Sequence, residues 1–253
     1  MEPIVKKVVN LPVYIFENRK DMGKEAAIDA AKRINAIIEK NGVANVVFAA
    51  APSQDDLLEN LLKQDIDWTK VRGFHQDEYV GIDESEPAGF GNFLRRAIFD
   101  KVPFMELHYL LCKADEAEAK CESYTELLKK YPIDLIFLGI GENGHLAFND
   151  PPVANFNDPK AVKPVKLDEI CRQQQVNDGC FECISLVPTH ALTLTVPTLM
   201  AADYHFCIVP AITKKQAVYE TLNGSIDEHC PASILRTKEN CILYLDNESS
   251  KLL

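Results

Sequence analysis

Three polar side chains that could act together in proton transfer lie within eight residues of the sequence. Asn143, His145 and Asp150 follow a short apolar run. Histidine is the side chain best suited to move protons near neutral pH. A neighbouring carboxylate can fix its tautomer and stabilise its charged form. A lone histidine in a tight loop would be expected only to bond the backbone, so the prediction of an acid/base His145, supported by Asn143 and Asp150, depends on the cluster.

A second group contains two adjacent acids, Asp77 and Glu78, in the run Phe74 to Tyr79. A carboxylate that is partly removed from water can act as a base toward a carbon-bound proton. Successive side chains of an extended chain point in opposite directions, so we expect only one of the two acids to face a site. The alternative is a solvated acidic turn without a chemical role.

The run from Gly139 to Gly144 spells G-x-G-x-x-G, a pattern typical of dinucleotide-binding loops. That function requires a long helix starting at the third glycine. Here the chain continues His-Leu-Ala-Phe-Asn-Asp-Pro-Pro, and the prolines would stop a helix within two turns. We therefore expect Gly141 and Gly144 to let the backbone approach a small ligand closely instead.

Lys214 follows Thr213 at the start of a predicted helix. A helix N-terminus with free N–H groups, a hydroxyl and a lysine is a natural anion site. A solvated helix start is the alternative, because lysines are common on surfaces.

The elements that must position these residues alternate short apolar runs with amphipathic stretches, which predicts a parallel sheet covered by helices. Nothing marks a domain boundary, so residues 1–253 are predicted to form one Rossmann-like α/β domain. The predicted helices are Met22–Lys40, a helix starting at Ser53 or Gln54 and reaching Leu62, Thr189–Met200 and Lys214–Leu222. The predicted strands are Asn45–Ala51, Val71–His75, Ile133–Gly139, His205–Val209 and Cys241–Leu245. Loops 52–54, 76–79 and 141–150 follow predicted strands, and ligands of open α/β sheets bind at strand carboxyl ends.

The composition limits the classes of partner. The 253 residues carry a net charge of −11, with 47% hydrophobic residues, as in a globular protein able to bury a full core. Such an acidic surface disfavours nucleic acid and anionic membranes as partners. The N-terminal run lacks the pattern of a signal peptide and no apolar run is long enough to span a bilayer, so we expect a cytoplasmic protein. The oligomeric state stays open, a homo-oligomer included.

The eight cysteines include one C-x-x-C pair, Cys180 and Cys183. No second pair follows at the spacing of a zinc ribbon, so structural or incidental thiols are favoured over a redox or metal role. We expect no metal site.

Four blocks, FHQDEYVGID, LGIGENGHLAFNDP, VPTHALTLTVPTLMAA and PASILR, resemble the glucosamine-6-phosphate deaminase/isomerase family in matching order. The resemblance covers about residues 46–253, and its Ala147-Phe148-Asn149 continuation favours the deaminase branch over the related 6-phosphogluconolactonases. It implies opening of an amino-sugar 6-phosphate ring, a proton shift from C2 to C1 and release of ammonia, without metal or organic cofactor. In this resemblance Asp77 is the proton-abstracting acid, Glu78 the second acid of its motif, and His145 the ring-opening residue.

The chain also departs from the family pattern. Asn143 stands where the family usually has Asp, and Asp150 where it has Glu. The phosphate loop, T-G-S-T-P in the family, is Ala50-Ala-Pro-Ser-Gln54 here. The family's phosphate arginine falls near Asp178-Gly179.

The residues expected to bind a small sugar phosphate are Ser53, Gln54, Gly141, Gly144, Arg172 and Lys214, with Arg172 as a replacement for the missing arginine. Two alternatives stay open. One is a lactonase-type hydrolase that uses His145 to activate water, and the other is a non-catalytic sugar-phosphate sensor.

Overall fold

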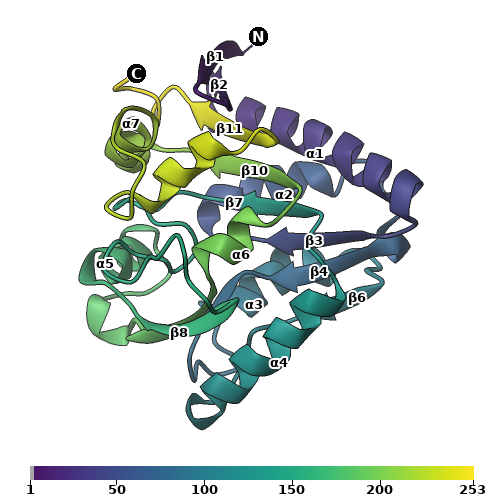
Figure 1. Cartoon of the computed structure of the whole chain (residues 1–253), viewed down its shortest axis with the longest axis vertical. Coiled ribbons are helices and arrows are strands. Elements are labelled where there is room, and N and C mark those ends of the chain that lie inside the picture. Colours follow the sequence, from purple (N-terminus) through teal and green to yellow (C-terminus); the bar gives the residue numbers. More distant parts are fainter. Residues whose placement is uncertain (1–2) are drawn as a thin grey trace.

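An eight-stranded sheet runs through the centre of the protein (Figure 1). The computed structural model describes residues 3–253. In the order in which they lie side by side, the strands are β1 (Ile4–Val8), β2 (Leu11–Phe16), β11 (Cys241–Asp246), β10 (Tyr204–Val209), β7 (Leu135–Leu138), β3 (Ala44–Phe48), β4 (Val71–His75) and β6 (Glu106–His108). Neighbours are parallel except β1 and β2, which form an antiparallel hairpin at one edge. The predicted α/β class with a mostly parallel sheet is confirmed.

The central strands are apolar throughout because both of their faces are covered. All four residues of β7 are buried. Leu135 and Phe137 belong to the hydrophobic cluster on one face of the sheet, whereas Ile136 and Leu138 belong to the cluster on the other. This alternation gives the sheet two cores.

Helices cover both faces of the sheet (Figure 1). Buried residues of α1 and α2 join the cluster that contains Leu135, and those of α4 and α7 join the cluster that contains Ile136. The α-helices are α1 (Arg19–Asn41), α2 (Asp55–Leu61), α3 (Phe90–Leu94), α4 (Ala117–Lys130), α5 (Glu169–Asn177), α6 (Val196–Met200) and α7 (Lys215–Asn223). The other helical segments, all 3-10 helices except the π-helical η3, are η1 (Pro52–Gln54), η2 (Trp68–Lys70), η3 (Arg95–Phe99), η4 (Ala114–Glu116), η5 (Ile184–Leu186), η6 (Ile212–Lys214) and η7 (Pro231–Thr237).

The longest helix, α1, confirms the helix predicted over Met22–Lys40. The side chain of Asn18 caps its start by accepting from the backbone N–H of Asp21. Gly42 ends it in the left-handed conformation with φ 81°, which glycine adopts without steric cost.

A second, three-stranded sheet contradicts one predicted helix. The prediction over Thr189–Met200 is wrong for its first half, which forms strand β9 (His190–Leu194). This strand pairs antiparallel with β5 (Asp77–Tyr79) and β8 (Val162–Lys166). The threonine and aliphatic residues of this segment favour a β-strand. Only Val196–Met200 is helical, as α6, with Pro197 in its first turn.

The other predicted strands are confirmed, with some shorter than expected. β4 has the predicted bounds Val71–His75. β3 and β7 end at Phe48 and Leu138, because the residues that follow leave the sheet and line a pocket. The sequence patterns give no prediction for the N-terminal hairpin, β6, β8, α3, α4 or α5.

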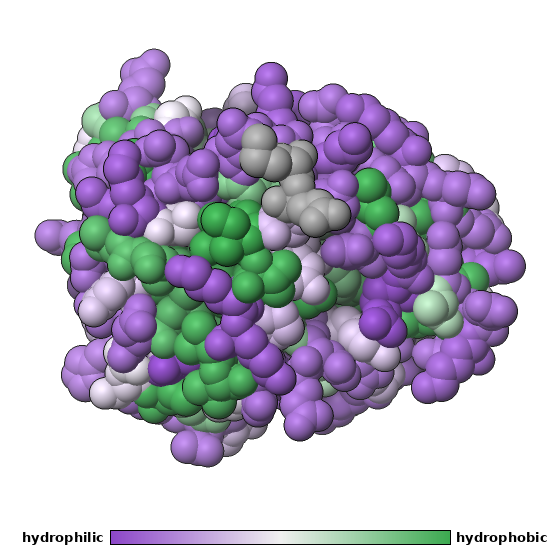
Figure 2. Space-filling model, turned by 90° about the horizontal axis from the view of Figure 1, so that it is seen from above, coloured by the Kyte–Doolittle hydropathy of each residue, from purple (hydrophilic) through white to green (hydrophobic). Residues whose placement is uncertain are grey.

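The surface is mainly hydrophilic in the view of Figure 2, with apolar patches between the polar residues. Its exposed apolar side chains include Ile4, Val5 and Leu252, near the two ends of the chain. Within residues 3–253, no helix has the length and apolar character needed to cross a membrane.

Candidate active site

One pocket lies at the carboxyl ends of the parallel strands, where the strand order reverses. From β3 the chain proceeds to β4 on one side, whereas β7 lies on the other side and is followed outward by β10 and β11. Such switch points are the usual ligand sites of open α/β sheets. The loops after β3, β4, β7 and β10 all line this pocket. Residues from the segments 52–54, 76–79 and 141–150 line this pocket together, although residues 77–79 form the short strand β5 and not the expected loop.

The glycine-rich loop after β7 places His145 in the pocket. No helix follows Gly144, and residues 139–150 form turns instead. A Cβ at Gly141 would lie 2.0 Å from Cε1 of His145, so only glycine leaves room for the imidazole at this position. Gly144 has φ 83°, and a Cβ there would also lie 2.7 Å from Sγ of Cys230. Both glycines thus serve the placement of His145, although Gly144 does not line the pocket itself.

The loop is fastened beyond His145 by the Ala-Phe-Asn run. The buried Asn149 amide donates to the backbone oxygens of Leu146 (2.9 Å) and Leu194 (2.9 Å). Phe148 stacks on Phe90 with ring centroids 5.3 Å apart. These contacts bind the loop to β9 and to the start of α3, so the position of His145 is held from two sides.

A polar network orients the imidazole. Nδ1 of His145 lies 2.7 Å from Oδ1 of Asn143 and 3.0 Å from Oδ1 of Asp150. Two acceptors on this side place the proton on Nδ1 and leave Nε2 as the nitrogen that can meet a ligand. Burial alone would raise the pKa of Asp150, but the hydrogen bonds from His145 and Asn143 hold that pKa below its usual value. The predicted grouping of these three residues is present in the structure.

Asp168 belongs to the same network and was missed by the sequence analysis. The Asn143 amide nitrogen donates to Asp150 (3.0 Å) and to Oδ2 of Asp168 (3.3 Å), while the Asp168 N–H donates to Asp150 (3.2 Å). The neutral amide therefore stands between two carboxylates. A third carboxylate at position 143 would meet both of them, which gives a physical reason for Asn at this position.

Of the two adjacent acids, only Asp77 lines the pocket. Burial and the charge of Glu78 raise its pKa well above the usual value of 3.8. Glu78 points the other way and accepts from the backbone N–H groups of Tyr79 (2.9 Å), Phe90 (3.1 Å) and Gly91 (2.8 Å). Burial raises the pKa of Glu78 as well. Its place at the start of α3 suits a carboxylate and gives it a structural role.

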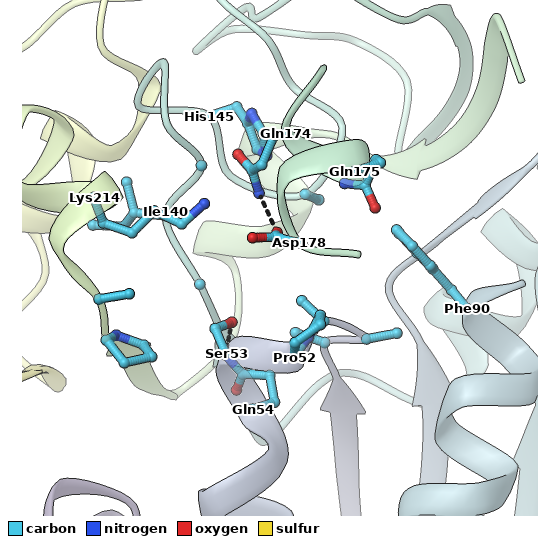
Figure 3. A pocket seen from close by; sticks show the side chains of 18 of the residues that line it. Pro52, Ser53, Gln54, Phe90, Ile140, His145, Gln174, Gln175, Asp178 and Lys214 are labelled. Atoms are coloured by element: carbon cyan, nitrogen blue, oxygen red, sulfur yellow. Dashed lines mark hydrogen bonds between the residues drawn. The ribbon is translucent and has the colours of Figure 1, made fainter. Parts of the chain in front are cut away.

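The far side of the pocket from Phe90 contains a buried lysine (Figure 3). Lys214, at the end of η6 and immediately before α7, is only 5% exposed. Burial lowers its pKa. Its ammonium has no hydrogen-bond partner in residues 3–253, and the nearest carboxylate oxygen, Oε1 of Glu142, is 3.9 Å away. Ser53 lies at the floor of the same pocket, and the Gln54 amide donates to its hydroxyl at 3.1 Å.

Helix α5 supplies a wall that the sequence analysis did not recognise. Gln174, Gln175 and Asp178 all line the pocket (Figure 3). Gln174 accepts from the Glu142 N–H (2.8 Å) and donates to Asp178 (3.3 Å). The Gln175 amide, 7% exposed, faces the pocket near Phe90. The i, i+1 and i+4 spacing of these residues on a helix is the only signal that would have grouped them.

Known proteins resemble this chain over most of its length. Residues 17–244 match the family model described as glucosamine-6-phosphate isomerases/6-phosphogluconolactonase. The chain belongs to this family. A glucosamine-6-phosphate deaminase of Listeria welshimeri is 34% identical over 233 residues, which cover 90% of this chain and 97% of the relative.

Two solved structures share the family fold. A monomeric glucosamine-6-phosphate deaminase has a TM-score of 0.86 at 24% identity, covering 95% of this chain and 99% of the other. A 6-phosphogluconolactonase of Thermotoga maritima has a TM-score of 0.75 at 20% identity, covering 95% and 100%. At these identities the likeness shows the fold alone.

One substrate-binding residue predicted from the family pattern lies elsewhere. Arg172 does not line the pocket. Its Nη2 donates to the backbone oxygens of Ile184 (2.7 Å) and Val187 (2.8 Å), which fastens α5 to the η5 loop. In place of a second pocket cation on α5, the structure has Asp178.

One cysteine, Cys171, lies next to the polar network of the site. All eight cysteines are free, Cys180 and Cys183 included. His145, Asp150 and Cys171 offer donor atoms within 4.8 Å of one another, close enough for a metal ion. Two of these donors already form the 3.0 Å hydrogen bond that orients the imidazole, and burial raises the pKa of Cys171 well above its usual value, which disfavours the metal-binding thiolate.

Proposed function

We propose that the protein is an amino-sugar-phosphate deaminase/isomerase that converts glucosamine 6-phosphate, or its galacto epimer, and water to the ketose 6-phosphate and ammonia. The observation that carries the proposal is the presence of Asp77 and His145 in one pocket, with their environments tuned for different tasks. The 34% identity to a glucosamine-6-phosphate deaminase supports it.

His145 suits the opening of the sugar ring. Its Nδ1 is held by Asn143 and Asp150, so Nε2 is free to exchange a proton with the ring oxygen. The negative charge of Asp150 stabilises the imidazolium that forms when Nε2 takes a proton. Ring opening requires a proton at the ring oxygen and removal of one from the C1 hydroxyl, and one histidine can perform both transfers in turn.

Asp77 suits the proton shift between carbon atoms. Carbon-bound protons are weakly acidic, and a carboxylate whose pKa is raised by burial is a stronger base than a solvated one. In the open-chain form Asp77 takes the proton from C2 and returns it to C1. The C1 aldehyde thereby becomes an alcohol, because its oxygen gains the proton that the amino nitrogen gives up. The bond from C2 to nitrogen then becomes an imine bond, which water hydrolyses to the ketone with release of ammonia. Each step is an acid/base step that these residues can supply.

The substrate phosphate is assigned to the end of the pocket at Lys214 and Ser53. Lys214 offers an unpaired buried ammonium, and Ser53 a hydroxyl. Phe90 and Gln175 lie toward the other end, with His145 between the two ends in Figure 3.

A coupled assay for ammonia and fructose 6-phosphate tests the function on purified protein given glucosamine 6-phosphate. We expect turnover that is lost in Asp77→Asn and kept in Asp203→Asn, which removes one exposed acid outside the pocket. Absence of turnover with both amino-sugar phosphates would reject the deaminase. Hydrolysis of 6-phosphogluconolactone would then identify a lactonase, and stabilisation by glucosamine 6-phosphate without any product would identify a sensor.

A further inference from the structure

More negative than positive charge acts on Lys214, which lines one end of the pocket. Lys214 and Arg19 are the two cationic residues that line the pocket in the described part of the chain. Arg19 is committed to Asp56 and to the backbone oxygen of Pro52. Nζ of Lys214 lies 3.9 Å from Oε1 of Glu142, and the negative charges of Asp178 and Glu142 both act on this ammonium. One available ammonium therefore faces two carboxylates before any ligand binds.

The negative charge of Asp178 does not stabilise the helix at whose end it lies. It is the C-terminal capping residue of α5, and the last turn of this helix contains no basic residue. A helix C-terminus carries partial negative charge, which makes a carboxylate there unfavourable. Within residues 3–253, no cationic side chain comes within 4.0 Å of Asp178, and its side chain accepts only the 3.3 Å hydrogen bond from Gln174. Residues that break a local rule without a structural gain are expected at functional sites.

Gln174 holds this arrangement in place. Its amide accepts from the backbone N–H of Glu142 and donates to Asp178. The Gln174 side chain is thus bonded both to Glu142 and to Asp178, the two acids whose charges act on Lys214. The carboxylate of Asp178 lines the pocket and is hydrogen-bonded to Gln174 (Figure 3).

We propose that Asp178 is a specificity-determining residue that sets the charge accepted beside Lys214. Its carboxylate repels a phosphate dianion but not a hydroxyl group, to which it can act as a hydrogen-bond acceptor. The pocket consequently binds an amino sugar with an uncharged C6 hydroxymethyl end about as well as the 6-phosphate. This inference rests on the proposed function, because it concerns the substrate of the same site.

The test compares glucosamine 6-phosphate with glucosamine in the wild type, in Asp178→Asn and in Glu169→Gln. Glu169 lies in the first turn of the same helix, is exposed and does not line the pocket, so its variant makes the same change in net charge. The ratio of kcat/KM values for the two sugars is the readout, and calorimetric titration with the same two sugars gives the corresponding ratio of affinities.

We expect a wild-type ratio below about tenfold, because a repelled charge offsets the attraction to Lys214. Asp178→Asn should raise the ratio by about tenfold or more through tighter phosphate binding, with glucosamine changed less than about twofold. Glu169→Gln should leave the ratio unchanged. A ratio in Asp178→Asn that stays at the wild-type value, or falls, overturns the proposal. If neither sugar yields product but the calorimetric ratio shifts as expected, the deaminase assignment fails and the role of Asp178 stands.

Discussion

At the scale of single residues, the site contains two acids whose environments push their pKa values in opposite directions. Asp77 has no hydrogen-bond donor that stabilises its charge in residues 3–253, and burial raises its pKa. Asp150 is also buried but receives hydrogen bonds from His145 and Asn143, which keep its pKa low. Such a pair separates two roles, a base of raised basicity and a permanent counter-charge.

Replacing His145 by Ala is expected to lower turnover of glucosamine 6-phosphate by about two to four orders of magnitude, the usual contribution of a positioned acid/base group. The measurement is kcat in the coupled assay. His190→Ala, which removes an exposed imidazole outside the pocket, should keep near-normal activity. A His145→Ala enzyme that works at the wild-type rate would remove His145 from the mechanism.

Asp77→Asn is expected to stabilise the fold while abolishing activity. Because the folded pKa lies above 3.8, the native state holds this proton to higher pH than the unfolded chain does. Stability contributed at low pH is therefore lost as the pH rises from about 3.8 through the folded pKa. Asn carries no titratable proton, so the variant does not lose this stability as the pH rises. Its Tm should therefore exceed that of the wild type by a few degrees at neutral pH. Thermal scans at several pH values test this, and a difference that grows toward acid pH would contradict it.

The sequence predicted the placement of the polar residues in short motifs better than that of isolated residues. Asp77, His145, Asn143 and Asp150 lie in two short motifs whose residue types indicate proton transfer. Asp178 could not be recognised in the same way, because its significance depends on its distance from Lys214, 36 positions along the chain. Arg172 is an error in the opposite direction. The sequence suggested a cation available to a ligand, but in the fold its guanidinium donates to backbone oxygens.

At the scale of elements, the glycine-rich loop positions His145 by leaving space for it. We expect Gly141→Ala to lower kcat by about two orders of magnitude or more, because its Cβ would overlap the imidazole at 2.0 Å and displace the acid/base group. Gly139→Ala is the matched control in the same loop, as its Cβ would meet no atom closer than 3.4 Å. Steady-state kinetics and urea unfolding of both variants provide the test. Equal losses of kcat in the two variants would show that steric placement of His145 is not the cause.

Some sequence patterns predicted the helices and strands correctly, and others did not. The apolar run around β7 and the helical spacing in α1 are strong because each element buries its whole length or one full face. Thr189–Met200 misled the prediction because a five-residue strand and a five-residue helix follow one another there, each too short to display a period. The antiparallel partners β5 and β8 are brought to β9 only by the tertiary fold.

At the scale of the whole molecule, the net charge and the pocket act on an anionic substrate in opposite ways. The chain carries a net charge of −11, and Figure 2 shows hydrophilic residues over most of one face. Lys214, by contrast, is buried within the pocket. Salt at about 0.1 M screens exposed charges beyond about 10 Å but affects buried pairs much less. Added salt should therefore weaken the general repulsion more than the local attraction.

We accordingly expect kcat/KM for glucosamine 6-phosphate to rise about two- to threefold when the ionic strength increases from about 0.01 M to 0.15 M. Glucosamine, which has no negative charge to be repelled by the surface, should show a flat or falling dependence. The comparison needs only the coupled assay at a series of sodium chloride concentrations. A steep fall of kcat/KM with salt for the phosphate ester would mean that exposed cations attract the substrate, and that the acidic surface does not govern its approach.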